Sequence, residues 1–110
     1  MQETKHEGGD HTQRVRELLT LNKFLIVITQ HAEIRLGQRQ IEKEDVLENL
    51  RTPDTLYFAR KRKEANEDEE CYQCYFRKSN QQCHIYGLAF NLKYMNVKVI
   101  TVIKARPRIQ

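Results

Sequence analysis

The spacing of apolar residues changes once along the chain, at Pro53. Before Pro53, apolar positions recur at intervals of three and four, which predicts amphipathic helices over about residues 12–20 and 42–50. After Pro53, apolar and polar positions alternate, which is typical of strands. Four segments have this alternation, and the short polar connections between them predict an antiparallel meander: residues 56–62, 71–77, 82–90 and 97–104.

An apolar, β-branched run at residues 24–28 predicts a strand buried on both faces. A helix follows it directly with Thr29 as N-cap, and the closing run at residues 97–103 predicts a central strand. This order predicts an α+β fold, with N-terminal helices packed on one side of a curved, mostly antiparallel sheet of four to five strands. Residues 10–110 are expected to form this single domain, after a disordered lead at residues 1–9.

The helix that follows the first apolar run carries basic side chains at intervals of four, namely His31, Arg35 and Arg39. At about 100° per residue these side chains share one face of the helix. That face lies within the arc bounded by the apolar residues Leu36 and Ile34, so it is directed toward the helix's packing partner. Burying an unpaired cation is costly. These three basic side chains, which we call the basic stripe, are therefore expected to meet carboxylates or to border an open cleft.

The composition is that of a globular domain with a heavily charged surface, with 39% hydrophobic and 31% charged residues. No apolar run approaches the roughly 18 residues that span a membrane, and no signal-peptide pattern is present. The formal net charge of +4 is compatible with an anionic partner such as RNA. The three cysteines, an odd number, favour reduced thiols and a cytoplasmic location.

A basic run at residues 60–63 precedes an acidic run at residues 64–70. Together they predict a solvated, self-neutralising hairpin tip between two strands. RNA clamping by the basic half is the alternative.

Several positions between residues 24 and 107 match the pattern of a known family. The matching positions are Ile28-Thr29-Gln30-His31-Ala32, Arg35, Arg39, Ile41, Glu44-Asp45-Val46, Leu50, Pro53, Cys83-His84-Ile85, Val99-Ile100-Thr101-Val102 and Pro107. On these positions the chain resembles the domain of unknown function family four-two-five-eight. It departs from the family at Ile103, where the family has a tyrosine.

The resemblance implies a fold and an activity. The family is placed near the RelE/ParE-like toxins and the colicin-type tRNases, which are small α+β domains. It therefore implies a RelE-like, metal-independent endoribonuclease of toxin type, with RNA (tRNA, mRNA or the ribosome) and a cognate antitoxin protein as partners. No metal ion and no cofactor are expected.

Such an enzyme would cut RNA with the RNA's own 2′-hydroxyl, which requires proton carriers and cations beside the phosphate. His31 and His84 are the candidate proton carriers. Arg35 and Arg39 have planar, bidentate donors that suit a phosphate. Tyr86 would share a strand face with His84 and contact the RNA. A series of cations at alternate positions would extend the phosphate contacts: Lys104, Arg106 and Arg108.

Each candidate also has a structural interpretation. His31 would then be a buried histidine bonded to a backbone carbonyl, and His84 a satisfied histidine within the sheet. Arg39 would pair with Glu44 or Asp45 across the turn that follows its helix. With these roles the domain would be a non-catalytic RNA- or protein-binding regulatory module on the same fold.

The cysteines raise the question of zinc, because Cys71, Cys74, Cys83 and His84 are all residues that can ligate it. Cys71 and Cys74 would lie on opposite faces of one strand, which argues against a shared metal ion. We expect instead a contact between Cys74 and Cys83 across neighbouring strands, as thiols or as a disulfide.

Overall fold

The structure, a computed structural model, describes residues 10–63 and 67–106. Within these ranges the chain forms three α-helices and five strands, which confirms the predicted α+β class. The predicted disordered lead at residues 1–9 lies outside the described residues. In chain order the elements are α1 (Thr12–Thr20), β1 (Leu25–Ile28), α2 (Gln30–Arg39), α3 (Lys43–Arg51), a 3₁₀ turn (Pro53–Thr55), β2 (Leu56–Arg62), β3 (Glu69–Arg77), β4 (Cys83–Asn91) and β5 (Asn96–Ala105).

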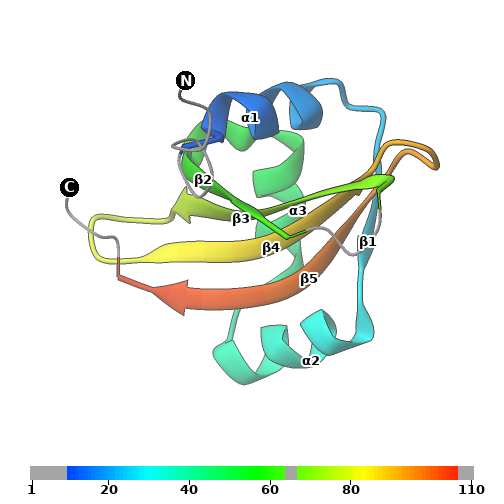
Figure 1. Ribbon diagram of the computed structural model, residues 1–110. Helices are drawn as coiled ribbons and strands as arrows, with labels where there is room; N and C mark the ends of the chain where they lie inside the picture. The colour runs from blue at the N-terminus through cyan, green and yellow to red at the C-terminus, as the bar shows by residue number, and fades with distance from the viewer. Residues whose placement is uncertain (1–9, 64–66, 107–110) are drawn as a thin grey trace.

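The five strands form one sheet in the order β1-β5-β4-β3-β2 (Figure 1). Strands β2 to β5 pair antiparallel, as the predicted meander requires, and β1 pairs parallel to β5. The expectation that the first apolar run is buried on both faces was wrong. Strand β1 lies at the edge of the described sheet, so Leu25 is 70% exposed and the rest of the strand is only half-buried.

One hydrophobic core joins the helices to one face of the sheet. In Figure 1, α3 lies behind the sheet, with α1 above it and α2 below it. The helices bury apolar residues at helical spacing, and β4 contributes the largest side chains through every second residue. The core members include Val15, Leu18, Leu19, Ala32, Leu36, Val46 and Leu50 from the helices, and Cys74, Phe76, Tyr86, Leu88, Phe90, Val97, Val99 and Val102 from the sheet.

Helix α1 is joined to β3 by a bidentate ion pair. Arg14 donates from Nε to Glu70 Oε1 at 3.0 Å and from Nη2 to Glu70 Oε2 at 2.7 Å, and the Tyr72 hydroxyl donates to Glu70 Oε1 at 2.8 Å. The Arg14 guanidinium therefore lowers the pKa of the Glu70 carboxyl. Glu70 is thus a half-buried residue of β3 rather than part of a solvated tip, and residues 64–66 of the predicted tip lie outside the described residues.

The expected contact between Cys74 and Cys83 was wrong because the register of β3 and β4 separates them. Cys74 pairs with Tyr86 and faces the core, whereas Cys83 pairs with Arg77 on the opposite face of the sheet. Both are thiols. Within residues 10–63 and 67–106, no three histidine, cysteine, aspartate or glutamate side chains are grouped in a way that could hold a metal ion.

The close packing of Gly87 against Thr101 gives a stability prediction. A Cβ atom at Gly87 would lie 2.5 Å from Thr101 Oγ1, so Gly87→Ala is expected to destabilise the fold by about 1–3 kcal/mol through overpacking. Urea unfolding would measure this change. Adding Thr101→Ala should restore most of the loss. The matched control is Gly37→Ala on the surface of α2, where nothing lies within 4 Å and where alanine should stabilise by roughly 0.5–1 kcal/mol.

Candidate functional site

His84 lies near the start of β4, on the helix-covered face of the sheet, and is only 2% exposed. Its Nδ1 atom is 3.2 Å from the Tyr86 hydroxyl, the next residue along the same face. Its Nε2 atom makes no hydrogen bond within the described part of the chain, and it is not among the side-chain atoms that are both fully buried and unbonded. This leaves one ring nitrogen for a further partner.

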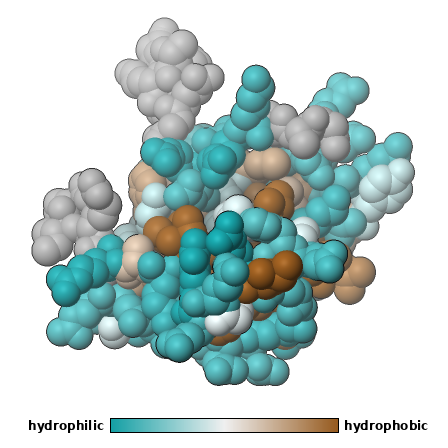
Figure 2. Space-filling model, turned by 90° about the horizontal axis from the view of Figure 1, so that it is seen from below, coloured by the Kyte–Doolittle hydropathy of each residue, from teal (hydrophilic) through white to brown (hydrophobic). Residues whose placement is uncertain are grey.

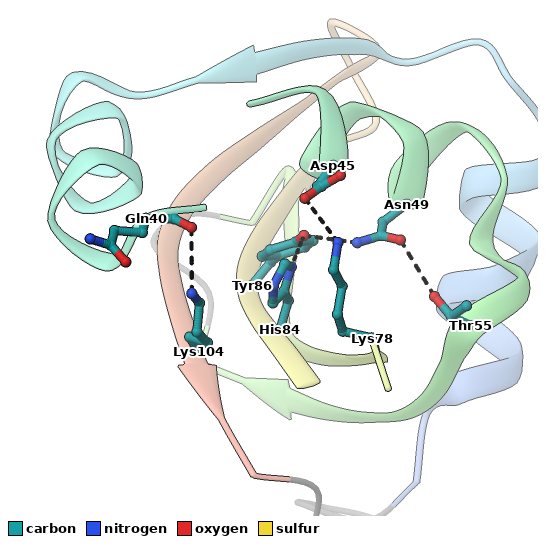
Figure 3. A network of polar contacts seen from close by, with 8 residues as sticks. All are labelled: Gln40, Asp45, Asn49, Thr55, Lys78, His84, Tyr86 and Lys104. Atoms are coloured by element: carbon teal, nitrogen blue, oxygen red, sulfur yellow. Dashed lines mark hydrogen bonds and ion pairs between the residues drawn. The ribbon is translucent and has the colours of Figure 1, made fainter. Parts of the chain in front are cut away.

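A chain of hydrogen bonds fixes the position of Tyr86 (Figure 3). Asn49 Nδ2 on α3 donates to the Tyr86 hydroxyl at 2.9 Å, and Thr55 Oγ1 donates to Asn49 Oδ1 at 3.4 Å. Burial raises the pKa of the Tyr86 hydroxyl, so it stays protonated at neutral pH. Tyr86 therefore holds the His84 ring in place and is itself held by α3.

Two lysines stand beside His84, one on each side. Lys78 follows β3 and donates from Nζ to Asp45 Oδ2 on α3 at 3.0 Å. Lys104 lies directly opposite His84 on β5, and its Nζ is 3.4 Å from the Gln40 carbonyl oxygen at the end of α2. Figure 3 shows these groups entering one region from α2, α3, β4, β5 and the β3–β4 turn. We call His84, Lys78 and Lys104 the His84 cluster.

The surroundings of His84 favour its neutral form. Burial is the largest cause that lowers the pKa of the imidazole, and the charges of Lys78 and Lys104 lower it further, while Asp45 opposes them. The His84 cluster therefore combines a neutral proton acceptor with two ammonium groups, which is an arrangement that can receive an anion.

The basic stripe of α2 lies beside the outer edge of β5, whereas His84 lies on β4, the strand at the inner edge of β5. Thr29 caps the helix by accepting a hydrogen bond from the Ala32 backbone N–H at 3.2 Å. His31 is exposed in the first turn, and its Nε2 accepts a hydrogen bond from Arg35 Nε at 3.4 Å. Arg35 also donates to Gln38, whereas Arg39 donates from Nε to the Val102 carbonyl at 3.0 Å. The Arg39 contact is to a backbone oxygen of β5 rather than to Glu44 or Asp45.

The structure does not bring His31 and His84 together. Gln40, the residue whose carbonyl meets Lys104, comes nine positions after His31, and at 1.5 Å per residue this is about 14 Å along the helix. His31 is exposed on the surface at the start of α2, whereas His84 is buried. Seen from the α2 side, the molecule is mostly hydrophilic with separate hydrophobic groups (Figure 2). Ile34 on α2 is 54% exposed.

The remaining candidates are Tyr86 on β4, Lys104 on β5, and two arginines after β5. Tyr86 and Lys104 belong to the surroundings of His84 described above, and exposed Arg106 comes directly after the strand. Arg108 lies outside the described residues.

A surface pocket of about 420 Å³ lies between β1, α2 and α3 and contains none of these candidates. Its floor is apolar, with Ile26, Ile28 and Leu47, and its rim includes the ion pair between Lys43 and Glu33 at 2.8 Å. No helix of the described residues is long and apolar enough to cross a membrane.

Comparison with known proteins identifies the family. A model of the family described as Domain of unknown function (DUF4258) matches residues 28–104, which run from the end of β1 almost to the end of β5. The chain belongs to this family. No curated protein and no solved structure matches it. The region shared with DUF4258 contains His31, both arginines of the stripe and the whole His84 cluster, whereas α1 and Arg106 lie outside it.

Sequence reasoning did not find Lys78, Asp45 or Asn49 as neighbours of His84. Asp45 lies 33 positions before Lys78, and Asn49 lies 37 positions before Tyr86, so only the packing of α3 on the sheet joins them. One sequence signal pointed to Lys78. It lies in the short connection between two predicted antiparallel strands, so it had to lie near the start of the second strand, where His84 is.

The environment of His84 gives a prediction about pH. Its pKa is lower in the folded protein than the value of about 6.5 in an unfolded chain, so the unfolded state binds more protons below that pH. The free energy of unfolding should therefore fall as the pH drops below about 6.5 toward the folded-state pKa. Urea unfolding between pH 7 and pH 5 should show a shallower decline for His84→Gln than for the unaltered protein, and equal slopes would contradict this.

Proposed function

We propose that this domain is a metal-independent endoribonuclease with a RelE-like toxin fold, and that it acts on RNA at the His84 cluster. The observation that carries this proposal is the position of His84 between Lys78 and Lys104, with Nε2 of the imidazole available to a further partner. Helices packed on a mostly antiparallel sheet are consistent with that fold. A cognate antitoxin protein, which would cover the site in the cell, is part of the same proposal.

The chemistry needs only groups of this chain and of the RNA. His84 takes the proton of a 2′-hydroxyl as its oxygen attacks the neighbouring phosphorus, and the bond from phosphorus to the 5′-oxygen breaks. The products are a 2′,3′-cyclic phosphate and a 5′-hydroxyl. The ammonium groups of Lys78 and Lys104 stabilise the added negative charge on the phosphate oxygens. Lys104, opposite His84, is placed to give a proton to the leaving 5′-oxygen.

The low pKa of His84 fits this role because a base must be unprotonated before it accepts a proton. A bound phosphate would offset the charges of the two lysines and raise the pKa of the imidazole, so the acceptor becomes stronger when substrate is present. Tyr86 keeps Nδ1 engaged, which directs Nε2 toward the substrate.

A second candidate function is RNA binding without cleavage. The observation that favours it is the burial of His84, whose side chain is 98% covered. The cations around it would then hold a phosphate while the imidazole serves only the structure.

The test is cleavage of a structured and an unstructured RNA by the purified domain in EDTA. His84→Gln should lower the rate about 10²- to 10⁴-fold, since glutamine can bond to Tyr86 but cannot carry a proton. Lys104→Gln should weaken substrate binding and rate together, because a phosphate ligand acts on the ground state and the transition state alike. Products ending in 2′,3′-cyclic phosphate would identify the reaction.

The matched control is His31→Gln, which alters an exposed histidine on α2. It should leave the rate near that of the unaltered domain. Loss of cleavage in His31→Gln with full activity in His84→Gln would move the site to α2. Binding without any cleavage would favour the second candidate.

A further inference from the structure

One face of the sheet is not covered by the described helices. The apolar residues of α1, α2 and α3 join the core on the other face, and no described helix packs here. The register places Cys83, Gly87 and Ala89 at the centre of this face, on β4. These small residues are buried although no described helix covers them. We call this surface the open face.

Three aromatic rings gather on the open face at β2 and β3. The centroid of Tyr75 lies 6.1 Å from that of Tyr57 and 5.4 Å from that of Phe58, in edge-to-face arrangements. The β-bulge between Leu56 and Phe58 allows two consecutive residues of β2 to contact one ring of β3. All three rings are half-buried, so each keeps part of its surface in contact with solvent.

Hydrogen bonds hold this cluster in a defined arrangement. Gln73 Nε2 donates to the Tyr75 hydroxyl at 3.2 Å, and Arg62 Nη1 donates to Gln73 Oε1 at 3.2 Å. The Arg77 guanidinium lies over the Tyr57 ring, 4.6 Å from its centroid. The rings are therefore ordered before any ligand arrives, which reduces the entropy lost on binding.

The open face is strongly cationic. It carries four exposed cations, and none of them forms an ion pair with a described carboxylate: Arg60, Arg62, Arg77 and Lys98. Glu69 is the acidic residue that the register adds to this face, and it is only 8% exposed. On the helix side, by contrast, Arg14, Lys43 and Lys78 each have a carboxylate partner.

We propose that the open face binds single-stranded RNA, with unpaired bases stacked on Tyr57, Phe58 and Tyr75 and phosphates held by the arginines. Half-buried rings beside cations that have no described carboxylate partner are a combination that can recognise bases and phosphates together. A duplex would present only its backbone to this surface, because its bases are already stacked. An acidic protein would use the cations but would leave the aromatic rings without a role.

The open face meets the His84 cluster at one end of the sheet. Arg77 ends β3 on the open face, and the next residue, Lys78, reaches Asp45 on the helix side. A strand bound across the open face would therefore lead to the proposed site of cleavage. This inference rests on the proposed function for its choice of RNA, but binding can be measured without cleavage.

The test is fluorescence anisotropy with a labelled 2′-O-methyl oligonucleotide of about 10 nucleotides, which cannot be cut by its own 2′-oxygen. Tyr75→Leu should weaken binding by roughly 5- to 100-fold, the effect of losing one stacked base. Arg60→Gln with Arg77→Gln should weaken binding and also reduce its salt dependence, by about 0.7 in the slope per lost phosphate contact. Thermal melts would verify that each variant folds.

The matched controls change the same residue types elsewhere. Tyr94→Leu alters a tyrosine that is 68% exposed after β4, and Arg51→Gln alters an exposed arginine on α3. Both should bind as the unaltered domain does. Binding that is retained in a domain without ribonuclease activity would reject the proposed function and keep this inference.

Competition experiments distinguish binding of single-stranded RNA from binding of other anionic polymers. Duplex RNA and polyglutamate of equal charge should displace the oligonucleotide poorly, and DNA of the same sequence reports how much the sugar contributes. Equal displacement by polyglutamate would overturn the proposal in favour of a general anion surface. No measurable binding at low salt, or full binding by Tyr75→Leu and the double arginine variant, would also overturn it.

Discussion

The outer edge of β5 is the constraint on which the arrangement of this domain depends. Strand β5 has ten residues, but β1 has only four and covers it only as far as Val99. Beyond that point the carbonyl groups of β5 need other partners, because unpaired backbone groups at a sheet edge are costly when buried and invite aggregation when exposed. Helix α2 meets this need: the backbone N–H and hydroxyl of Thr29 both donate to the Val99 carbonyl, and Arg39 donates to Val102.

This placement of α2 decides the chemistry that the stripe can perform. Arg39 is occupied by a structural contact, whereas His31 and Arg35 remain on the outer side of the helix. The end of α2 then brings the Gln40 carbonyl to Lys104, beside His84. Protonating an imidazole that is buried next to two ammonium groups costs free energy, so the pKa of the imidazole is lowered. Groups with shifted pKa values are concentrated at functional sites.

The periodicity of the sequence identified the helices, the meander and the Thr29 cap, because each depends on residues close in the chain. It could not place β1, since an apolar run reads the same in a central strand and in an edge strand that has a helix beside it. It also failed for Cys74 and Cys83, whose separation depends on a register set by the β3–β4 turn. The structural interpretation of Arg39 gave it a carboxylate partner, and the unpaired edge of β5 explains why the partner is a carbonyl instead.

The ion pair between Lys78 and Asp45 acts on His84 through its two charges. Both side chains are more than a third exposed, and such pairs contribute on the order of 0–1 kcal/mol, so a phosphate can compete with Asp45 for Lys78 at little cost. When Lys78 moves to a phosphate, Asp45 loses its partner and its charge raises the pKa of His84 more effectively. Under the proposed mechanism, the same exchange would therefore strengthen the imidazole as a base. The hydrogen bonds from Asn49 to Tyr86 and from Tyr86 to His84 do not involve Lys78, so the ring would keep its orientation throughout.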